Sequence, residues 1–371
     1  MSIEPIKMPK WGLAMEEGTI GQWWVDEGAS IAEGEDLVDI ETAKIANVYE
    51  AHQDGILRRI IGQPGQTLPV GALIGVMANA DIGDDAIDAF ITDFTASFVP
   101  GEADDDDAGP EITSVDVYGR NLRVGVMGQQ TSGTPIILLH GFGGDLNNWM
   151  LVQPALAEDR PVYAIELPGH GQSSKDVADG KLPTLATGIV AAIRALDLEH
   201  ISVVGHSLGG AIAIEVAAQL QSNVSSLNLI CPAGMPGGRI NRDYLDSFVA
   251  ARRARDLREP AKLLFANSDM VSRDMLEDLI KTKRLDGAEA ALTAIKNNLN
   301  SDDPSFAKLG DRLSELDTKI TIIASRADKI VGAPDETALP DAVTVHWLDN
   351  VGHMPHLEAS GDVVQILKSV I

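Results

Sequence analysis

The sequence is poor in cysteine, in positive charge and in long apolar runs. Only Cys231 is a cysteine among 371 residues, which excludes an intramolecular disulfide and a thiolate cluster for structural zinc, as expected in a reducing compartment. Lys and Arg number 29 against 55 Asp and Glu, and the net charge of −26 argues against nucleic-acid or anionic-membrane partners. No stretch approaches the ~18 uninterrupted apolar residues of a membrane span, and the N-terminus lacks the apolar stretch of a secretion signal. We therefore expect a soluble cytoplasmic protein without a metal centre.

The negative charge is concentrated in one short segment. Residues 81–119 hold 12 acidic residues and no basic ones. Within them, GEADDDDAGPE at 101–111 combines Gly, Pro and an Asp run without an apolar period, which is typical of a solvated linker. At roughly 150 residues per domain, the length indicates at least two domains. We expect these domains at residues 1–79 and 112–371, joined by an acidic linker at 80–111.

Apolar residues recur at helical spacing within this linker, which predicts a short amphipathic helix. They are Ile87, Phe90, Ile91, Phe94 and Phe98. Two uses of the stripe remain open: it packs against a neighbouring domain of the same chain, or it binds another protein.

The first 79 residues contain an internal repeat at an offset of 37 residues. Its matching glycines are Gly18, Gly28 and Gly34 in the first copy and Gly55, Gly65 and Gly71 in the second. Short β-rich runs between turn glycines predict two copies of one small β unit, combined in a flattened barrel or sandwich. At the junction of the copies, the segment DIETAKIANV places Lys44 at the tip of a predicted hairpin.

Residues 3–78 resemble a lipoyl domain, from MPKWGLAMEEG through the tetrapeptide ETAK to the repeated glycines. The resemblance implies that Lys44 carries lipoic acid in amide linkage. Biotin-carrying domains share this fold but have Met on both sides of their lysine. Here the neighbours are Ala43 and Ile45, which favours lipoic acid.

From residue 112 the apolar runs alternate with helical stretches, which predicts a mostly parallel sheet covered by helices on both faces. Runs such as IILLHG, ISVVGHS and ITIIASRAD have the near-continuous Val, Ile and Leu content of buried strands. Residues 232–305 show helical periodicity without strands, so we expect an inserted helical cap. Ligands of such open sheets bind at the C-terminal strand ends.

Those strand ends carry the residues of a serine nucleophile. Ser207 is the centre of a G-x-S-x-G motif between the strand ISVV and a helix-forming run, which is the context of a nucleophile elbow. Serine needs a base to remove its proton, and the base needs an acid to orient it. Asp328 and His353 follow later predicted strands in the required order, and His356 is a competitor for the role of base.

The oxyanion of a tetrahedral intermediate needs preorganised hydrogen-bond donors. We expect them in the backbone N–H groups of Leu208 and of Phe142, which lies in the turn HGFGG. With ELPGHGQSS, GHSLGG, ASRADKIV and NVGHMPHLE, this turn makes residues 112–371 resemble an α/β-hydrolase. That fold hosts esterases, lyases, thioesterases and transferases, so the resemblance leaves the substrate open.

The combination of the two domains resembles the dihydrolipoamide acetyltransferase component of acetoin dehydrogenase complexes. The resemblance implies transfer of an acetyl group from dihydrolipoyl lysine to coenzyme A. It also implies a thiamine-diphosphate-dependent dehydrogenase and dihydrolipoamide dehydrogenase as partners, and a homo-oligomer. Two alternatives stay open: a lipoyl-tethered serine hydrolase that releases acyl groups to water, and a carrier whose hydrolase domain is only a scaffold.

The phosphates of coenzyme A require cations, and the predicted cap holds a basic segment. Seven basic residues lie between Arg239 and Lys262, against four acidic ones. We take Arg252, Arg253 and Arg255 as candidate phosphate contacts, because arginine binds phosphate with two parallel hydrogen bonds. The alternative is a solvated helix face whose arginines pair with neighbouring carboxylates.

Overall fold

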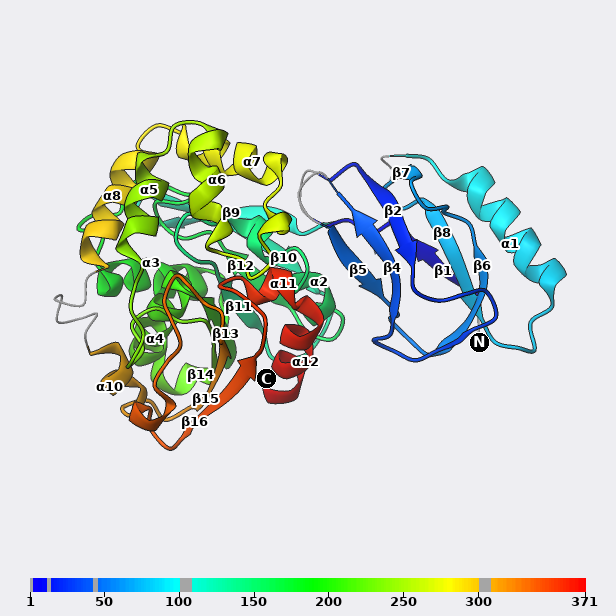
Figure 1. Cartoon of the computed structure of the whole chain (residues 1–371). Helices are drawn as coiled ribbons and strands as arrows, with labels where there is room; N and C mark the ends of the chain where they lie inside the picture. Colours follow the sequence, from blue (N-terminus) through cyan, green and yellow to red (C-terminus); the bar gives the residue numbers. More distant parts are fainter. Residues whose placement is uncertain (1–2, 12–14, 43–45, 101–108, 300–307) are drawn as a thin grey trace. The chain divides into compact units, whose positions relative to one another are not determined.

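The computed structural model describes residues 3–11, 15–42, 46–100, 109–299 and 308–371. The chain divides into two compact units, which we describe separately (Figure 1). The first comprises residues 1–109 with the short segment 272–275, and the second comprises the remainder. In the described part of the chain, no helix has both the length and the apolar character that a membrane crossing requires.

Two four-stranded sheets form the first unit. One sheet has the order β1 (Glu4–Lys7), β8 (Leu73–Ala78), β6 (Gly55–Ile60), β3 (Ser30–Ile31). The other has the order β5 (Ala46–Glu50), β4 (Asp36–Glu41), β2 (Glu17–Trp23), β7 (Thr67–Pro69). An offset of 37 residues carries β4 onto β8 and the start of β3 onto the start of β7, so the internal repeat of the sequence is a repeat of strands. The predicted all-β domain is confirmed.

Two pairs of repeat glycines are required by backbone conformation. Gly28 and its counterpart Gly65 have φ of 92° and 82°, and Gly34 and Gly71 both have φ of 81°. Such left-handed conformations are strained for residues that carry a Cβ. The equivalent turns bring equivalent apolar side chains into the core, where Ile20, Leu37, Ile40, Leu57 and Ile74 are fully buried.

Strands β4 and β5 form an antiparallel hairpin in which Glu41 pairs with Ala46. Residues 42–45 are therefore the connection between two hydrogen-bonded strands. Lys44 itself lies outside the described residues, and its place at the tip stays a prediction.

Helix α1 (Asp84–Ser97) packs against the first unit. Its residue Ile87 is fully buried in a cluster with Leu73 and Val76 of β8. Three ion pairs hold the start of the helix to β6: Arg58 with Asp84 at 2.9 Å, and Arg59 with Asp84 at 3.4 Å and with Asp88 at 3.1 Å. Ile87 is thus covered by the same chain, and Phe90, Ile91 and Phe94 pack partly buried against the same cluster, which agrees with the first of the two uses considered for the stripe.

The second unit contains an eight-stranded sheet in the order β16-β15-β14-β13-β11-β12-β10-β9. The strands are β9 (Glu111–Val117), β10 (Arg120–Met127), β11 (Ile136–Leu139), β12 (Val162–Ile165), β13 (Ile201–His206), β14 (Val224–Ile230), β15 (Lys319–Ser325) and β16 (Val343–Leu348). Strands β9 and β10 form an antiparallel hairpin, β10 pairs antiparallel with β12, and the other pairs are parallel. This is the mostly parallel sheet predicted from the sequence.

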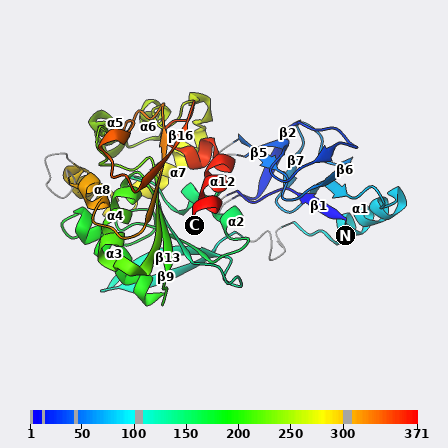
Figure 2. The same cartoon turned by 90° about the horizontal axis from the view of Figure 1, so that it is seen from below.

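Helices cover both faces of this sheet. In Figure 2, α3 (Leu182–Ala195) and α4 (Leu208–Leu220) lie on one side, and α2 (Gln153–Leu156) and α12 (Ser360–Val370) lie on the other. Between β14 and β15 the described residues contain helices and no strand, as expected of a cap. These helices are α5 (Arg242–Ala250), α6 (Ala254–Lys262), α7 (Arg273–Lys283), α8 (Ala288–Asn298) and α10 (Leu309–Leu313).

Candidate active site

Ser207 lies at a sharp turn between β13 and α4. Its backbone has φ of 54° and ψ of −114°, a strained conformation that the surrounding structure must hold at a cost of about 1–3 kcal/mol. The two motif glycines make the turn possible. A Cβ on Gly205 would overlap the backbone of Gly209, and a Cβ on Gly209 would overlap the carbonyl oxygen of Leu139. The residues therefore form the nucleophile elbow that the motif predicts.

Asp328 and His353 come together at the ends of neighbouring parallel strands, β15 and β16. The Nδ1 of His353 lies 2.8 Å from Oδ2 of Asp328, and both side chains are buried. The other carboxylate oxygen accepts backbone N–H bonds from Ile330 and Val331 at 2.8 and 3.0 Å. Burial alone raises the pKa of Asp328, but His353 and these N–H groups outweigh it and lower that pKa below its ordinary value. An ionised Asp328 thus holds the imidazole of His353 by its Nδ1.

A hydrogen bond links the elbow to the loop that carries His353. The Nε2 of His206, next to the nucleophile, lies 2.8 Å from the backbone oxygen of His353, and the two rings are 4.7 Å apart. Among the described residues the Ser207 hydroxyl itself has no hydrogen-bond partner. Catalytic hydrogen bonds often tighten only in the substrate complex.

The two predicted oxyanion donors belong to segments next to Ser207, the HGFGG turn and the start of α4. A Cβ built on Gly141, one residue before Phe142, would lie 3.2 Å from the Cβ of Ser207, so the HGFGG turn is in close contact with the elbow. Leu208 is the first residue of α4, where N–H groups have no partner within the helix. Within the described residues neither the N–H of Phe142 nor that of Leu208 makes a hydrogen bond. Both are available to a developing negative charge.

His356, the competitor for the role of base, has a different environment. It is fully buried against the rings of Trp149 and His206, and both its ring nitrogens lack a partner among the described residues. Burial, with the nearby His353, lowers its pKa to about 3. Asp328 contacts His353 and not His356, and a histidine base requires such a carboxylate partner.

Two side chains at this site were not singled out from the sequence. The sulfur of Cys231 lies within 4.8 Å of the ligand atoms of Asp328 and His353, and burial, followed by the charge of Asp328, raises the thiol pKa well above its ordinary value. A protonated thiol, and an imidazole whose Nδ1 is engaged by Asp328, are poor metal ligands, so we interpret Cys231 as a neutral neighbour of the Asp–His pair. The sequence feature that could have indicated Cys231 is its position directly after β14, the strand that pairs with β15.

Glu358 is the second of these side chains. Its carboxylate accepts the N–H of Gly352 at 2.8 Å and the N–H of Ala266 at 2.7 Å, and His353 N–H donates to the Leu264 oxygen at 2.7 Å. The loop that carries His353 is therefore bonded to the segment that follows α6. Glu358 lies one helical turn beyond the loop. Its partner Ala266 is 92 residues away in the sequence, so no local sequence pattern predicts this hydrogen bond.

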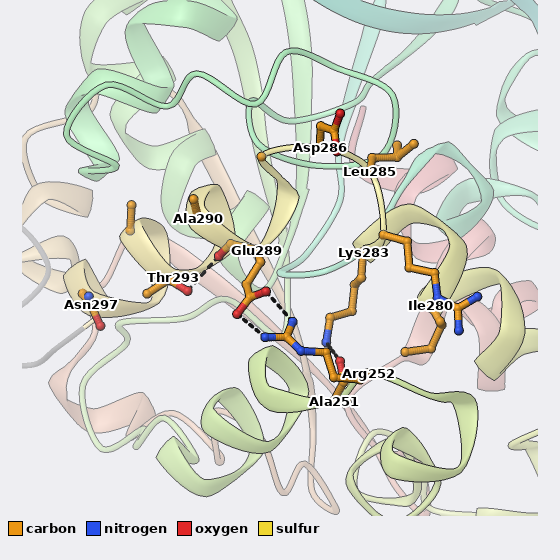
Figure 3. Close-up of a pocket in the computed structure, with 13 residues that line it drawn as sticks. Ala251, Arg252, Ile280, Lys283, Leu285, Asp286, Glu289, Ala290, Thr293 and Asn297 are labelled. Carbon is orange, nitrogen blue, oxygen red and sulfur yellow. Dashed lines mark hydrogen bonds and ion pairs between the residues drawn. The ribbon is translucent and has the colours of Figure 1, made fainter.

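The structure separates the three cap arginines. Arg252 forms an ion pair with Glu289 and lines a pocket of about 900 Å³, shown in Figure 3. Arg253 and Arg255 are not among the residues that line this pocket. Arg253 is the N-terminal cap residue of α6, and Arg255 lies 3.8 Å from Asp256, as in the alternative of a solvated, paired helix face.

Both parts of the chain are similar to known protein families. Residues 136–366 match the model of the Alpha/beta hydrolase family, and residues 4–77 match the model described as "Biotin-requiring enzyme". Two relatives are named "Dihydrolipoyllysine-residue acetyltransferase component of acetoin cleaving system". The relative from Cupriavidus necator is 38% identical over 367 residues, covering 99% of this chain and 97% of the relative. The relative from Pseudomonas putida is 39% identical over 363 residues, covering 98% and 97%. The chain belongs to this family.

Solved structures resemble the second unit of this family member. A bacterial membrane phospholipase A is 24% identical with a TM-score of 0.61, covering 71% of this chain and 86% of its own. A meta-cleavage product hydrolase from Pseudomonas fluorescens IP01 is 19% identical with a TM-score of 0.61, covering 70% and 96%. These likenesses confirm the α/β-hydrolase fold and carry no information on substrate.

Buried histidines make the stability of the second unit sensitive to acid. Burial lowers the pKa of His140 and His356 to about 3 and that of His170 to about 4. Because unfolded histidine titrates near 6.5, the unfolded chain binds more protons below that pH, and stability rises with pH. The contribution is complete above about pH 6.5, and about 2 kcal/mol per histidine is lost at pH 5. Glu166 and Glu215, whose pKa burial raises, act in the opposite direction and reduce the fall.

We therefore expect the free energy of unfolding to fall by several kcal/mol between about pH 8 and pH 5. Urea unfolding of the full chain, followed by helical circular dichroism, measures it. Burial also lowers the pKa of His206, so His356→Leu removes one of four such histidines and should reduce the dependence on pH by about a quarter. Equal stability at both pH values would show that these histidines are not kept neutral by folding.

Proposed function

We propose that this chain is an acetyltransferase that receives an acetyl group on lipoyl-Lys44 and passes it to coenzyme A through Ser207. The nearly full-length relatives named for this activity support the proposal. The observation that carries it is the buried Asp328–His353 pair beside the Ser207 elbow, in the same chain as a lipoyl-type domain. On this proposal, residues 1–79 carry the acyl group and residues 112–371 transfer it.

Lys44 is the proposed attachment point for lipoic acid. Its position between Glu41 and Ala46, which pair with each other in β4 and β5, and its primary amine fit an amide-linked arm. When bound, the lipoyl group supplies the acetyl group as a thioester and leaves as a thiol. The single cysteine of the chain is buried and unpaired, which agrees with work in a reducing cytoplasm.

The chain's own residues then act in two half-reactions. Ser207 Oγ attacks the thioester carbonyl, His353 Nε2 accepts the hydroxyl proton, and the N–H groups of Phe142 and Leu208 stabilise the oxyanion. His353 returns the proton to the leaving thiol, which leaves an acetyl ester on Ser207. The thiol of coenzyme A next attacks this ester while His353 takes its proton and gives it back to Ser207. Asp328 stabilises the imidazolium in both halves.

A lipoyl-tethered hydrolase would use the same residues with water as the second nucleophile. The two functions therefore differ in which nucleophile, water or the coenzyme A thiol, reaches the acetyl ester on Ser207. We expect acetylated, lipoylated protein to yield acetyl-CoA when coenzyme A is present and very little acetate when it is absent. Quantifying both products over time tests the proposal, and rapid acetate release without coenzyme A would establish the hydrolase instead.

The relatives' name places them in a multicomponent system, which supports partners for this chain as well. We propose that a thiamine-diphosphate-dependent dehydrogenase loads the arm and that dihydrolipoamide dehydrogenase reoxidises it, with the chain in a homo-oligomer. The sequence has no basic subunit-binding module, so these enzymes need another contact surface.

A further inference from the structure

The cap contains a pocket of about 900 Å³, between the α7–α8 connection and the segment that follows α5. That volume is at the upper end of the range of ligand sites in proteins, roughly 300–1,000 Å³. Figure 3 shows Arg252, Lys283, Glu289, Thr293 and Asn297 arranged around it. The pocket is therefore large enough for a nucleotide, and charged and polar side chains form part of its lining.

Three cations line this pocket, and their hydrogen bonds distinguish them. Lys283 Nζ donates to the backbone oxygens of Phe248, Val249 and Ala251, so it stabilises the C-terminal end of α5 and has no donor to spare. Arg252 is paired with Glu289 at an exposed position, where such a pair contributes little stability and can be exchanged. The exposed Arg284 guanidinium has no partner among the described residues.

One aromatic ring connects this pocket to the nucleophile. The ring of Phe248 lies 4.8 Å from Lys283 Nζ on one side and 5.7 Å from the ring of Phe142 on the other. Phe142 belongs to the HGFGG turn, which contacts Ser207 through Gly141. Lys283, which lines the pocket, and the buried Phe248 thus connect the pocket to the oxyanion turn.

We infer that this pocket binds the phosphate-bearing nucleotide end of coenzyme A, with Arg284 and Arg252 as its phosphate contacts. The inference rests on the proposed function. In a chain with a net charge of −26, the three cations of this lining outnumber its two carboxylates, Asp286 and Glu289, which suits a polyanion. The phosphate takes the place of the Glu289 carboxylate on Arg252, and the flexible arm of coenzyme A leads its thiol past Phe248 to Ser207. Of the three arginines that the sequence suggested as phosphate contacts, the inference keeps Arg252, and it adds Arg284.

The experiment compares two acetyl acceptors that share the same thiol arm: coenzyme A and pantetheine, which has no phosphate. Arg284→Gln and Arg252→Gln should each raise the Michaelis constant for coenzyme A about tenfold, with kcat nearly unchanged. Values for pantetheine should stay within about twofold, since it makes no phosphate contact. Arg258→Gln, an exposed arginine of α6 outside the pocket lining, is the matched control and should affect neither acceptor.

A further variant gives an effect of opposite sign. Glu289→Gln removes the carboxylate that competes for Arg252, so it should lower the Michaelis constant for coenzyme A by roughly twofold to fivefold. If the Arg252–Glu289 pair has only a structural role, Arg252→Gln and Glu289→Gln should both lower activity, with coenzyme A and with pantetheine alike. Equal losses toward coenzyme A and pantetheine, or no change for coenzyme A in Arg284→Gln, would overturn the site.

The proposed function and the proposed nucleotide site can be disproved separately. If the wild-type protein acetylates neither thiol and releases only acetate, the proposed function is wrong. If both thiols are acetylated and the arginine variants do not distinguish them, the transferase stands and the nucleotide site lies elsewhere.

Discussion

Ser207→Ala and His353→Ala should each lower the rate of acetyl transfer by about 10⁴- to 10⁶-fold, and the double variant should be little worse than either. The reason is that nucleophile and base act as one unit: without the hydroxyl there is nothing for His353 to deprotonate. Single-turnover transfer from acetylated, lipoylated protein to coenzyme A is the measurement. The intact mass of Ser207-containing peptides after loading should also show an acetyl group in wild type that Ser207→Ala lacks.

Asp328→Asn tests the third member of the set. The amide cannot accept the His353 Nδ1 hydrogen bond in the same way, so the imidazole loses its orientation and the stabilisation of its charged form, at a cost of roughly 10³- to 10⁴-fold. Near-additive losses in the Ser207/His353 double variant, or ready transfer by Ser207→Ala, would instead indicate direct attack by the coenzyme A thiol without an acyl-enzyme. Unchanged urea midpoints in all variants are needed to attribute the losses to chemistry.

The sequence was sufficient where geometry is fixed by neighbouring residues. Gly205 and Gly209 must flank Ser207 because any side chain there overlaps the backbone, so five residues specify the elbow. Gly34 and Gly71 are likewise required, because both have a positive φ. Such required glycines make the repeat visible in the sequence. Asp328 could be proposed because parallel strands end at one edge of the sheet, which places residues far apart in the chain side by side.

Contacts that depend on distant partners could not be foreseen. The hydrogen bond from Ala266 N–H to Glu358 joins the cap to the loop of the base across 92 residues. Arg252 lines the pocket and its neighbour Arg253 caps α6, and nothing in the composition or periodicity of the sequence distinguishes the two arginines. Helix α1 likewise has a clear apolar stripe, but only the fold shows that β8 covers it.

Lys44→Arg should abolish lipoylation, and with it all acetyl transfer that starts from the complete system. Arginine keeps the positive charge of the hairpin connection, but its guanidinium offers no primary amine for an amide bond. Because the flanking β4 and β5 strands pair through Glu41 and Ala46, the substitution should leave the domain folded. Intact-mass spectrometry of protein from a lipoylating host measures the modification directly.

Free S-acetyl-dihydrolipoamide separates the carrier from the catalyst in this variant. A small soluble donor needs no attachment to the chain, so Lys44→Arg should still transfer acetyl from it to coenzyme A at the wild-type rate, whereas Ser207→Ala should not. The two substitutions thus produce opposite patterns with tethered and free donors, because one removes the arm and the other removes the nucleophile. Modification that persists in Lys44→Arg would place the arm on another lysine, and loss of transfer from the free donor would mean that Lys44 is needed beyond its role as an attachment point.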